Sequence, residues 1–94
     1  MNELIEAELN NLKRKTYTEL ASMNKYQVEK VKKGSKTISI SIWKDTLDNN
    51  NLRIVVQTYK HLFFHIGEMD ADGFQIDEKG NIIDLKREEI YAFI

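Results

Sequence analysis

The sequence predicts an α+β fold: a two-layer domain with an N-terminal helix packed on a four- to five-stranded, mainly antiparallel sheet, followed by a short C-terminal helix. Three observations predict it. Apolar residues recur every three or four positions near the N-terminus, every second position through the middle, and at helical spacing again near the end. The chain has 94 residues, which suits one hydrophobic core, so residues 1–94 are expected to form a single domain.

The N-terminal helix is predicted from one apolar stripe with charged residues around it. The stripe consists of Leu4, Ile5, Leu9 and Leu12. Thr16 followed by Glu19 has the spacing of a capping box, which starts a new helical turn. We therefore expect a break or kink near Lys15–Thr16, with a second helical segment over residues 17–23.

The first strands are predicted from alternation and turn residues. Residues 26–33 read as an edge strand, and Gly34 provides a tight turn. The clearest strand follows, with isoleucine at every second position. A loop is expected over residues 45–51 and another strand over residues 52–59. The predicted core consists of Leu4, Leu9, Leu12, Leu20, Ile38, Ile40, Ile42, Ile54 and Val56.

The last third of the chain predicts shorter elements. A bend or turn is expected near Lys60–His61, separating residues 52–59 from 62–66, because a strand running on through residue 66 would be unusually long. The acidic residues and glycines of 67–73 predict a turn. A final hairpin is expected around Gly80, and residues 85–94 predict the short helix.

The composition excludes several classes of protein. The chain has neither cysteine nor proline, so it is not a disulfide scaffold, a thiolate zinc protein or a cysteine-dependent enzyme. No apolar run approaches the roughly 20 residues of a membrane span, and the acidic N-terminus does not resemble a signal peptide. We therefore expect a cytoplasmic protein that binds no membrane. Lysine outnumbers arginine 11 to 3, a bias that suggests a bacterial or phage origin.

Motifs for catalysis and metal binding are weak. His61 and His65 lie four residues apart near several carboxylates, but the glutamate of an HExxH motif is missing. Residues 70–73 resemble the start of a calcium loop, yet Phe74 occupies the fifth position, where a ligand is needed. The glycines are isolated and form no phosphate-binding loop. We expect no enzyme activity, no cofactor and no metal, with a histidine metal site as the weakest hypothesis.

The charge is unevenly distributed along the chain. The formal net charge of −1 combines +3 over residues 1–47 with −4 over residues 48–94. The basic segment 13–36 is a candidate for weak nucleic-acid binding, because lysines contact phosphates and nearby aromatic rings can stack on bases. Its candidate residues are Lys13, Arg14, Lys15, Lys30, Lys32 and Lys33.

The leading functional hypothesis is a non-enzymatic protein–protein interaction or accessory module. Trp43, Val55 and Tyr59 share the sheet face opposite the isoleucines, so they form a candidate surface for a protein partner or for self-association. The alternative is that the C-terminal helix or the loop over residues 45–51 covers these side chains. Weak nucleic-acid binding is the second hypothesis.

Overall fold

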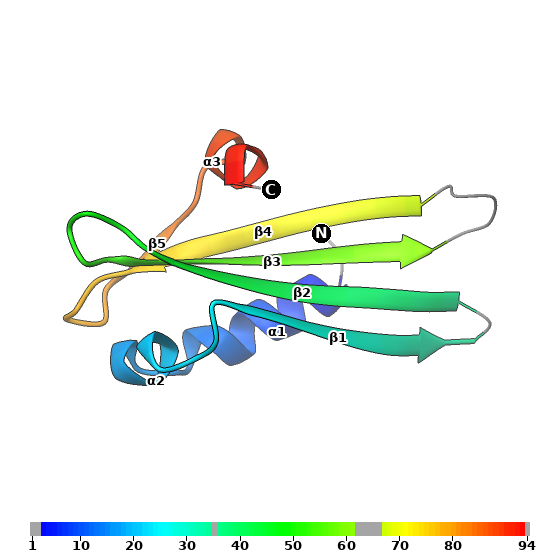
Figure 1. Cartoon of the computed structure of the whole chain (residues 1–94), viewed down its shortest axis with the longest axis horizontal. Helices are drawn as coiled ribbons and strands as arrows, with labels where there is room; N and C mark the ends of the chain where they lie inside the picture. The colour runs from blue at the N-terminus through cyan, green and yellow to red at the C-terminus, as the bar shows by residue number, and fades with distance from the viewer. Residues whose placement is uncertain (1–2, 35, 62–66, 94) are drawn as a thin grey trace.

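The computed structural model describes residues 3–34, 36–61 and 67–93 and shows two helical layers flanking one sheet (Figure 1). The predicted α+β architecture is confirmed: an N-terminal helix packs on a five-stranded antiparallel sheet, and a short helix follows it. The elements are α1 (Glu3–Lys13), α2 (Tyr17–Ala21), β1 (Tyr26–Lys33), β2 (Lys36–Thr46), β3 (Leu52–His61), β4 (Gly67–Ile76), β5 (Ile82–Asp84) and α3 (Arg87–Phe93).

The strands form a meander in the order β1-β2-β3-β4-β5, each antiparallel to the next. Directly opposed residues share a face of the sheet. One row of opposed residues consists of Tyr26, Trp43, Val55 and Gly73. The next row on either side belongs to the opposite face of the sheet, because successive strand residues alternate between the faces. We call the side of this row the α3 face and the other side the α1 face.

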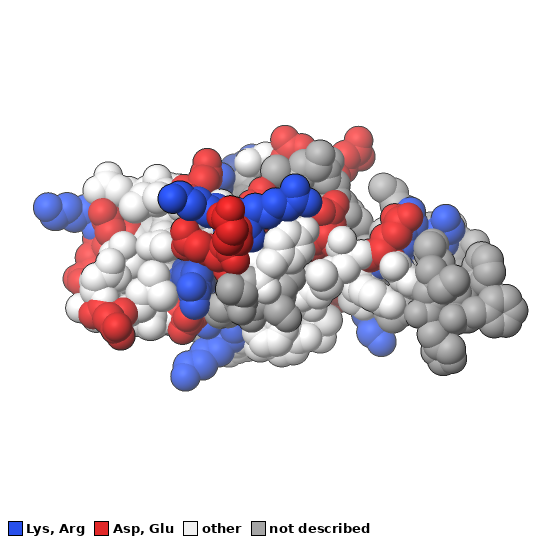
Figure 2. Space-filling view, turned by 90° about the horizontal axis from the view of Figure 1, so that it is seen from above, with Lys and Arg blue, Asp and Glu red and all other residues white. Residues whose placement is uncertain are grey.

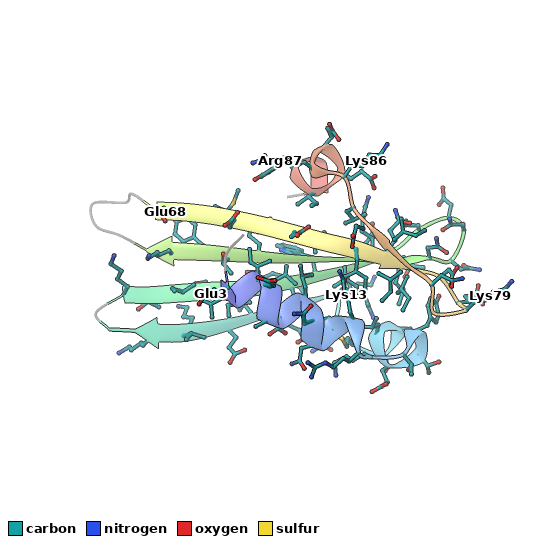
Figure 3. The ribbon with its side chains drawn as sticks, turned by 180° about the vertical axis from the view of Figure 1, so that it is seen from behind. Glu3, Lys13, Glu68, Lys79, Lys86 and Arg87 are labelled. Carbon is teal, nitrogen blue, oxygen red and sulfur yellow. The ribbon has the colours of Figure 1, made fainter. Side chains whose placement is uncertain are left out.

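The main core lies between α1 and the α1 face of the sheet. Figure 3 shows α1 crossing the strands from Glu3 to Lys13. The predicted core residues are confirmed as buried, except that Leu4 is only partly buried at its margin. Four further side chains are buried in the same cluster: Ile5, Leu52, Phe74 and Ile76.

A second, smaller core lies on the α3 face. Leu85 and Ile90 pack on Val55, and Trp43 and Ala71 contact this cluster at its margin. The Leu85 amide also donates to the Gly73 carbonyl at 3.3 Å, which fixes the start of the segment that leads into α3. The helix itself begins at Arg87, two residues later than the predicted start.

The predicted break in the N-terminal helix is confirmed. The Glu19 amide donates to Thr16 Oγ1 and the Thr16 amide donates to Glu19 Oε1, both at 3.1 Å, so Thr16 caps α2. The far end of α2 is held by Lys44 of β2, whose ammonium donates to the carbonyls of Ala21 and Met23. A cation is favourable there because helical carbonyls are unsatisfied at a C-terminus.

Two sequence predictions about the sheet are wrong. β2 continues to Thr46, which shortens the loop predicted over 45–51. β3 runs to His61, two residues past its expected end, and its antiparallel pairing with β4 ends at His61 opposite Gly67. β4 occupies residues 67–76, where an acidic turn was expected over 67–73. Ten in-register pairs with β3 account for this strand, because the ladder hydrogen bonds outweigh the turn preference of its glycines and aspartates. Residues 62–66 lie outside the described part.

The final hairpin is as predicted. Gly80 adopts a φ of 89°, in the left-handed region that favours glycine. Asp77 organises the turn, since its carboxylate accepts bonds from the Asn81 side chain and from the backbone amides of Lys79 and Asn81, all at 2.9 Å. Within the described residues, every helix is too short and too polar to cross a membrane.

The core assignment predicts a large effect of Ile40→Ala. Ile40 is only 6% exposed and belongs to the main core, so truncation leaves a cavity beneath α1. We expect the free energy of unfolding to fall by about 2–5 kcal/mol. Ser41→Ala, on the opposite face, is the control and should change stability little. Urea unfolding of both variants checks this, and a near-unchanged midpoint for Ile40→Ala would contradict it.

The Asp77 turn predicts a pH-dependent stability. The Asn81 side chain, together with the backbone amides, holds the pKa of the Asp77 carboxyl below its ordinary value. A lowered folded-state pKa stabilises the fold above the unfolded pKa, and this contribution is lost as the pH falls. Asp77→Asn should therefore lower the Tm at pH 7, and the gap to the wild type should narrow in acid. The control is Glu78→Gln, and an equal gap at both pH values would refute the prediction.

Candidate protein-interaction site

The structure places Trp43, Val55 and Tyr59 together on the α3 face, as the sequence predicted. Val55, however, is fully buried beneath Leu85 and Ile90, so α3 covers it and it is not a surface residue. Trp43 is partly buried against the same cluster, and its ring lies 4.2 Å from the ring of Tyr26. Trp43 and Val55 of the predicted patch therefore form part of the surface on which Leu85 and α3 pack.

Tyr59 lies further along β3, away from α3. Its side chain covers Gly67, where an added Cβ would lie 2.3 Å from Tyr59 Cζ and from its hydroxyl oxygen. Met69 is its direct neighbour across the strands, and Met69 Sδ accepts a bond from the Gln57 side chain at 2.8 Å. Tyr59 thus packs across the start of β4 and leaves Met69 exposed.

The described candidate nucleic-acid residues lie on different elements. Lys13 lies at the end of α1, where its ammonium contacts Asp84 of β5 at 3.2 Å and approaches the Phe74 ring. Arg14 and Lys15 follow it directly. Lys30 and Lys32 lie on β1, at the opposite edge of the sheet from β5.

The second group of basic residues also includes Lys33, whose side chain lies outside the described part of the structure. His65 and the side chain of His61 also lie outside the described part, so the structure does not describe the histidines of the proposed metal site. Among the residues that are described, no group of three or more potential ligands could hold a metal ion.

The outer edge of β4 is largely open. β5 pairs only with Phe74–Ile76, so in the described residues no strand covers the outer side of Gly67–Asp72. The Gly73 carbonyl points outward, because it accepts the bond from Leu85. Successive strand residues direct their backbone groups to opposite edges. Met69 and Ala71 therefore present their amides and carbonyls outward, ready to pair with another strand.

A hollow of about 410 Å³, which we call the α3 hollow, lies between this edge and α3. Asp70, Ala71, Asp72 and Leu85 line it from the sheet side, and Ile90 and Tyr91 line it from the helix. Arg87 also lines it, with its guanidinium 5.6 Å from the centre of the Tyr91 ring. Figure 2, which looks onto the α3 side of the molecule, shows acidic and basic side chains interspersed around this region.

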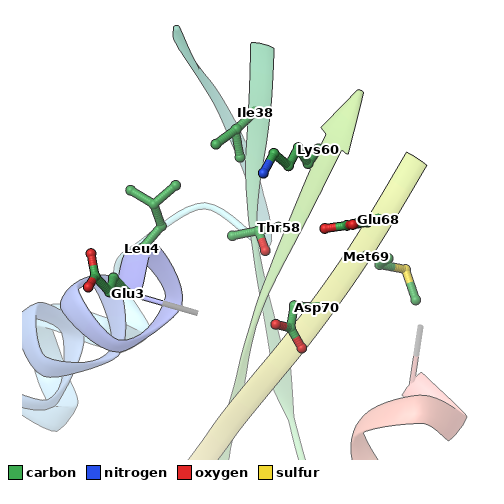
Figure 4. Close-up of a pocket in the computed structure, with 8 residues that line it drawn as sticks. All are labelled: Glu3, Leu4, Ile38, Thr58, Lys60, Glu68, Met69 and Asp70. Atoms are coloured by element: carbon green, nitrogen blue, oxygen red, sulfur yellow. The ribbon is translucent and has the colours of Figure 1, made fainter. Parts of the chain in front are cut away.

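An acidic hollow of about 460 Å³ lies on the α1 face, beside the first turn of α1. Figure 4 shows the three carboxylates around it, from Glu3, Glu68 and Asp70. Lys60, Ile38 and Thr58 also line it. The open edge of β4 thus has a carboxylate-rich hollow on one face and, on the other, the α3 hollow, whose lining mixes apolar and charged side chains. In Figure 3, Glu68 marks the start of this edge and Arg87 the start of α3.

Sequence analysis missed this site because it interpreted residues 67–73 as a turn. A signal was nevertheless present. Glu68, Asp70 and Asp72 alternate with Met69 and Ala71, which is the period of a strand with one polar face. The acidic half of the charge distribution is therefore partly a stripe along one strand edge.

Comparison with known proteins found no match among family models, curated proteins or solved structures.

Gly73 predicts a test of how α3 is held. A Cβ at Gly73 would lie 2.3 Å from the Ile54 carbonyl oxygen and 3.0 Å from Leu85 Cδ1. Because the carbonyl belongs to the ladder, Gly73→Ala must push β4 or the Leu85 segment outward. We expect a loss of about 1–3 kcal/mol in stability and greater acrylamide quenching of Trp43 fluorescence. Gln75→Ala is the control; unchanged quenching in Gly73→Ala would contradict the assignment.

Proposed function

We propose that the chain is a non-enzymatic protein-interaction module that binds an extended segment of a partner protein along the open edge of β4, beside α3. We call this surface the β4–α3 groove; it comprises the outer side of Gly67–Asp72 and the α3 hollow. Strand addition of this kind draws affinity from main-chain hydrogen bonds and specificity from hollows that receive alternate side chains. A chain without cysteine suits a reducing compartment, so we place this role in the cytoplasm.

The observation that carries the proposal is the coincidence of open backbone groups with the α3 hollow, in which Ala71, Leu85, Ile90 and Tyr91 provide apolar surface. The outward amides and carbonyls of Met69 and Ala71 lie on the same edge as the hollow. Ala71 is small, which leaves space between the edge and Ile90 for a side chain of a bound strand. Backbone groups alone would bind without selectivity, and an apolar surface alone would not align a ligand.

The outer edge of β1 supports the choice of β4 by contrast. β1 is also an edge strand, because it pairs only with β2 among the described strands. Its Lys30 and Lys32 are typical of natural edges that resist further pairing. We therefore assign the recruiting role to β4.

Binding rather than catalysis suits the side chains at the groove. The described residues that line the hollow include neither serine nor histidine, and four of them are apolar or aromatic. Its charged members are two aspartates and Arg87. Such a lining favours packing and orientation of a ligand over nucleophilic chemistry.

The test uses matched proline substitutions on the two edges. Proline lacks an amide hydrogen and is tolerated on an edge strand where that amide faces outward. Ala71→Pro removes an outward amide from β4. Val28→Pro removes an outward amide from β1. The Lys44 amide of β2 donates to the Lys25 carbonyl, so the backbone groups of odd-numbered residues here point toward β2. The backbone groups of Val28 therefore point outward.

We expect a partner that co-purifies with the tagged wild-type protein and with Val28→Pro to be lost with Ala71→Pro. The captured partner is then purified, and its Kd should be at least tenfold weaker for Ala71→Pro in calorimetry. Circular dichroism spectra of both variants establish that they are folded. A partner that binds Ala71→Pro as tightly as Val28→Pro would overturn the assignment of the groove.

A further inference from the structure

We propose that the segment bound in the β4–α3 groove alternates basic and apolar residues and runs antiparallel to β4, in line with β5. This inference rests on the proposed function and names the chemistry of its partner. It follows from the alternation along the open edge: Glu68, Asp70 and Asp72 occupy α1-face positions, and Met69 and Ala71 occupy α3-face positions. Leu85, Ile90 and Tyr91 line the hollow beside Ala71.

The direction of the bound segment follows from where β5 ends. β5 runs antiparallel to β4 for three residues and stops at Asp84, opposite Phe74. The chain then turns over the α3 face through Leu85. The ladder positions opposite Gly67–Asp72 are the ones that a longer β5 would occupy. A ligand that continues the direction of β5 keeps the sheet antiparallel, which is the slightly more stable arrangement.

Ligand residues on the α1 face meet carboxylates. In an antiparallel ladder, directly opposed residues share a face, so the positions opposite Asp72, Asp70 and Glu68 lie on the α1 face. Glu3 adds a further carboxylate at the acidic hollow, while Lys60 opposes Glu68 and offsets part of its charge. Asp72 accepts a bond from the Gly73 amide at 2.8 Å, so Asp70 is the main partner for a ligand lysine or arginine.

Ligand residues between these positions meet apolar side chains. The positions opposite Ala71 and Met69 lie on the α3 face, and Ala71 lines the α3 hollow there. Ile90 and Tyr91 of α3 and Leu85 provide the surface there. A β-branched residue such as valine fits both the hollow and an extended backbone. The expected ligand pattern is therefore basic, apolar, basic, apolar, basic.

A second copy of this chain fits the groove poorly. If β1 of a second copy continued the sheet in register, Glu29 would lie opposite Asp70, and both would be on the α1 face. Like charges directly opposed across strands are destabilising. The lysines Lys30 and Lys32 would lie on the α3 face, away from the carboxylates. The charge pattern thus favours a different protein.

The experiment titrates the full chain with three synthetic peptides flanked by glycine and serine. The first is Lys-Val-Lys-Val-Lys, the second has the same composition with its lysines grouped together, and the third replaces lysine by glutamate. We expect the alternating peptide to bind at least tenfold tighter than the grouped one, and the glutamate peptide not to bind. Hydrogen exchange should slow at the amides of Met69 and Ala71 only with the alternating peptide.

Protein variants then locate the contacts. We expect Asp70→Asn to raise the Kd of the alternating peptide about two- to fivefold, the range of one cross-strand ion pair. The matched control Glu29→Gln removes a carboxylate from the α1 face at the other edge and should leave the Kd unchanged. Ala71→Pro should raise the Kd at least tenfold, and Val28→Pro should not.

The two proposals fail in different ways. If the grouped or glutamate peptide binds as tightly as the alternating one, the proposed ligand chemistry is overturned and the binding role stands. The same conclusion follows if no peptide binds but Ala71→Pro still abolishes capture of the partner. If no peptide binds and Ala71→Pro still captures the partner, both proposals are overturned. If Asp70→Asn and Glu29→Gln weaken binding equally, the effect is one of overall charge and the proposed register is overturned.

Discussion

Burial of both faces of β3 constrains the rest of the structure. Ile54 and Val56 face α1, and Val55, between them, faces α3; all three are fully buried. A strand with consecutive apolar residues needs cover on both sides, because each exposed branched side chain would cost about 1.5–3 kcal/mol of lost burial. One helix cannot supply both, so the chain places a helix on each face, at opposite ends of the sequence.

This requirement also explains why the edge of β4 is open. To reach Val55, the chain must leave the plane of the sheet after β5 and cross the α3 face with Leu85. A longer β5 would cover the outer side of β4, but Leu85 and Ile90 would then no longer lie over Val55. Gly73 permits the crossing, since it has no side chain between Leu85 and the Ile54 carbonyl. Core packing and the open edge therefore share one cause.

Local signals in the sequence predicted much of the fold. The isoleucine alternation placed β2 and its buried face, Thr16 and Glu19 placed the start of α2, and Gly80 placed the last hairpin. The candidate site was not predictable in this way. Residues 67–73 are rich in aspartate and glycine, so local composition favours a turn, and only their pairing with β3 makes them a strand. The cover over Val55 likewise depends on α3, distant in sequence.

The carboxylates of β4 have a consequence for colloidal behaviour. An exposed strand edge is a template for indiscriminate pairing and fibril growth, which natural proteins suppress with charged residues. Glu68, Asp70 and Asp72 occupy every second position of the open segment, so two such edges that approach each other repel. These carboxylates therefore oppose aggregation through the open edge. If their charge were neutralised, the edges of two copies could pair and the sheet could extend from molecule to molecule.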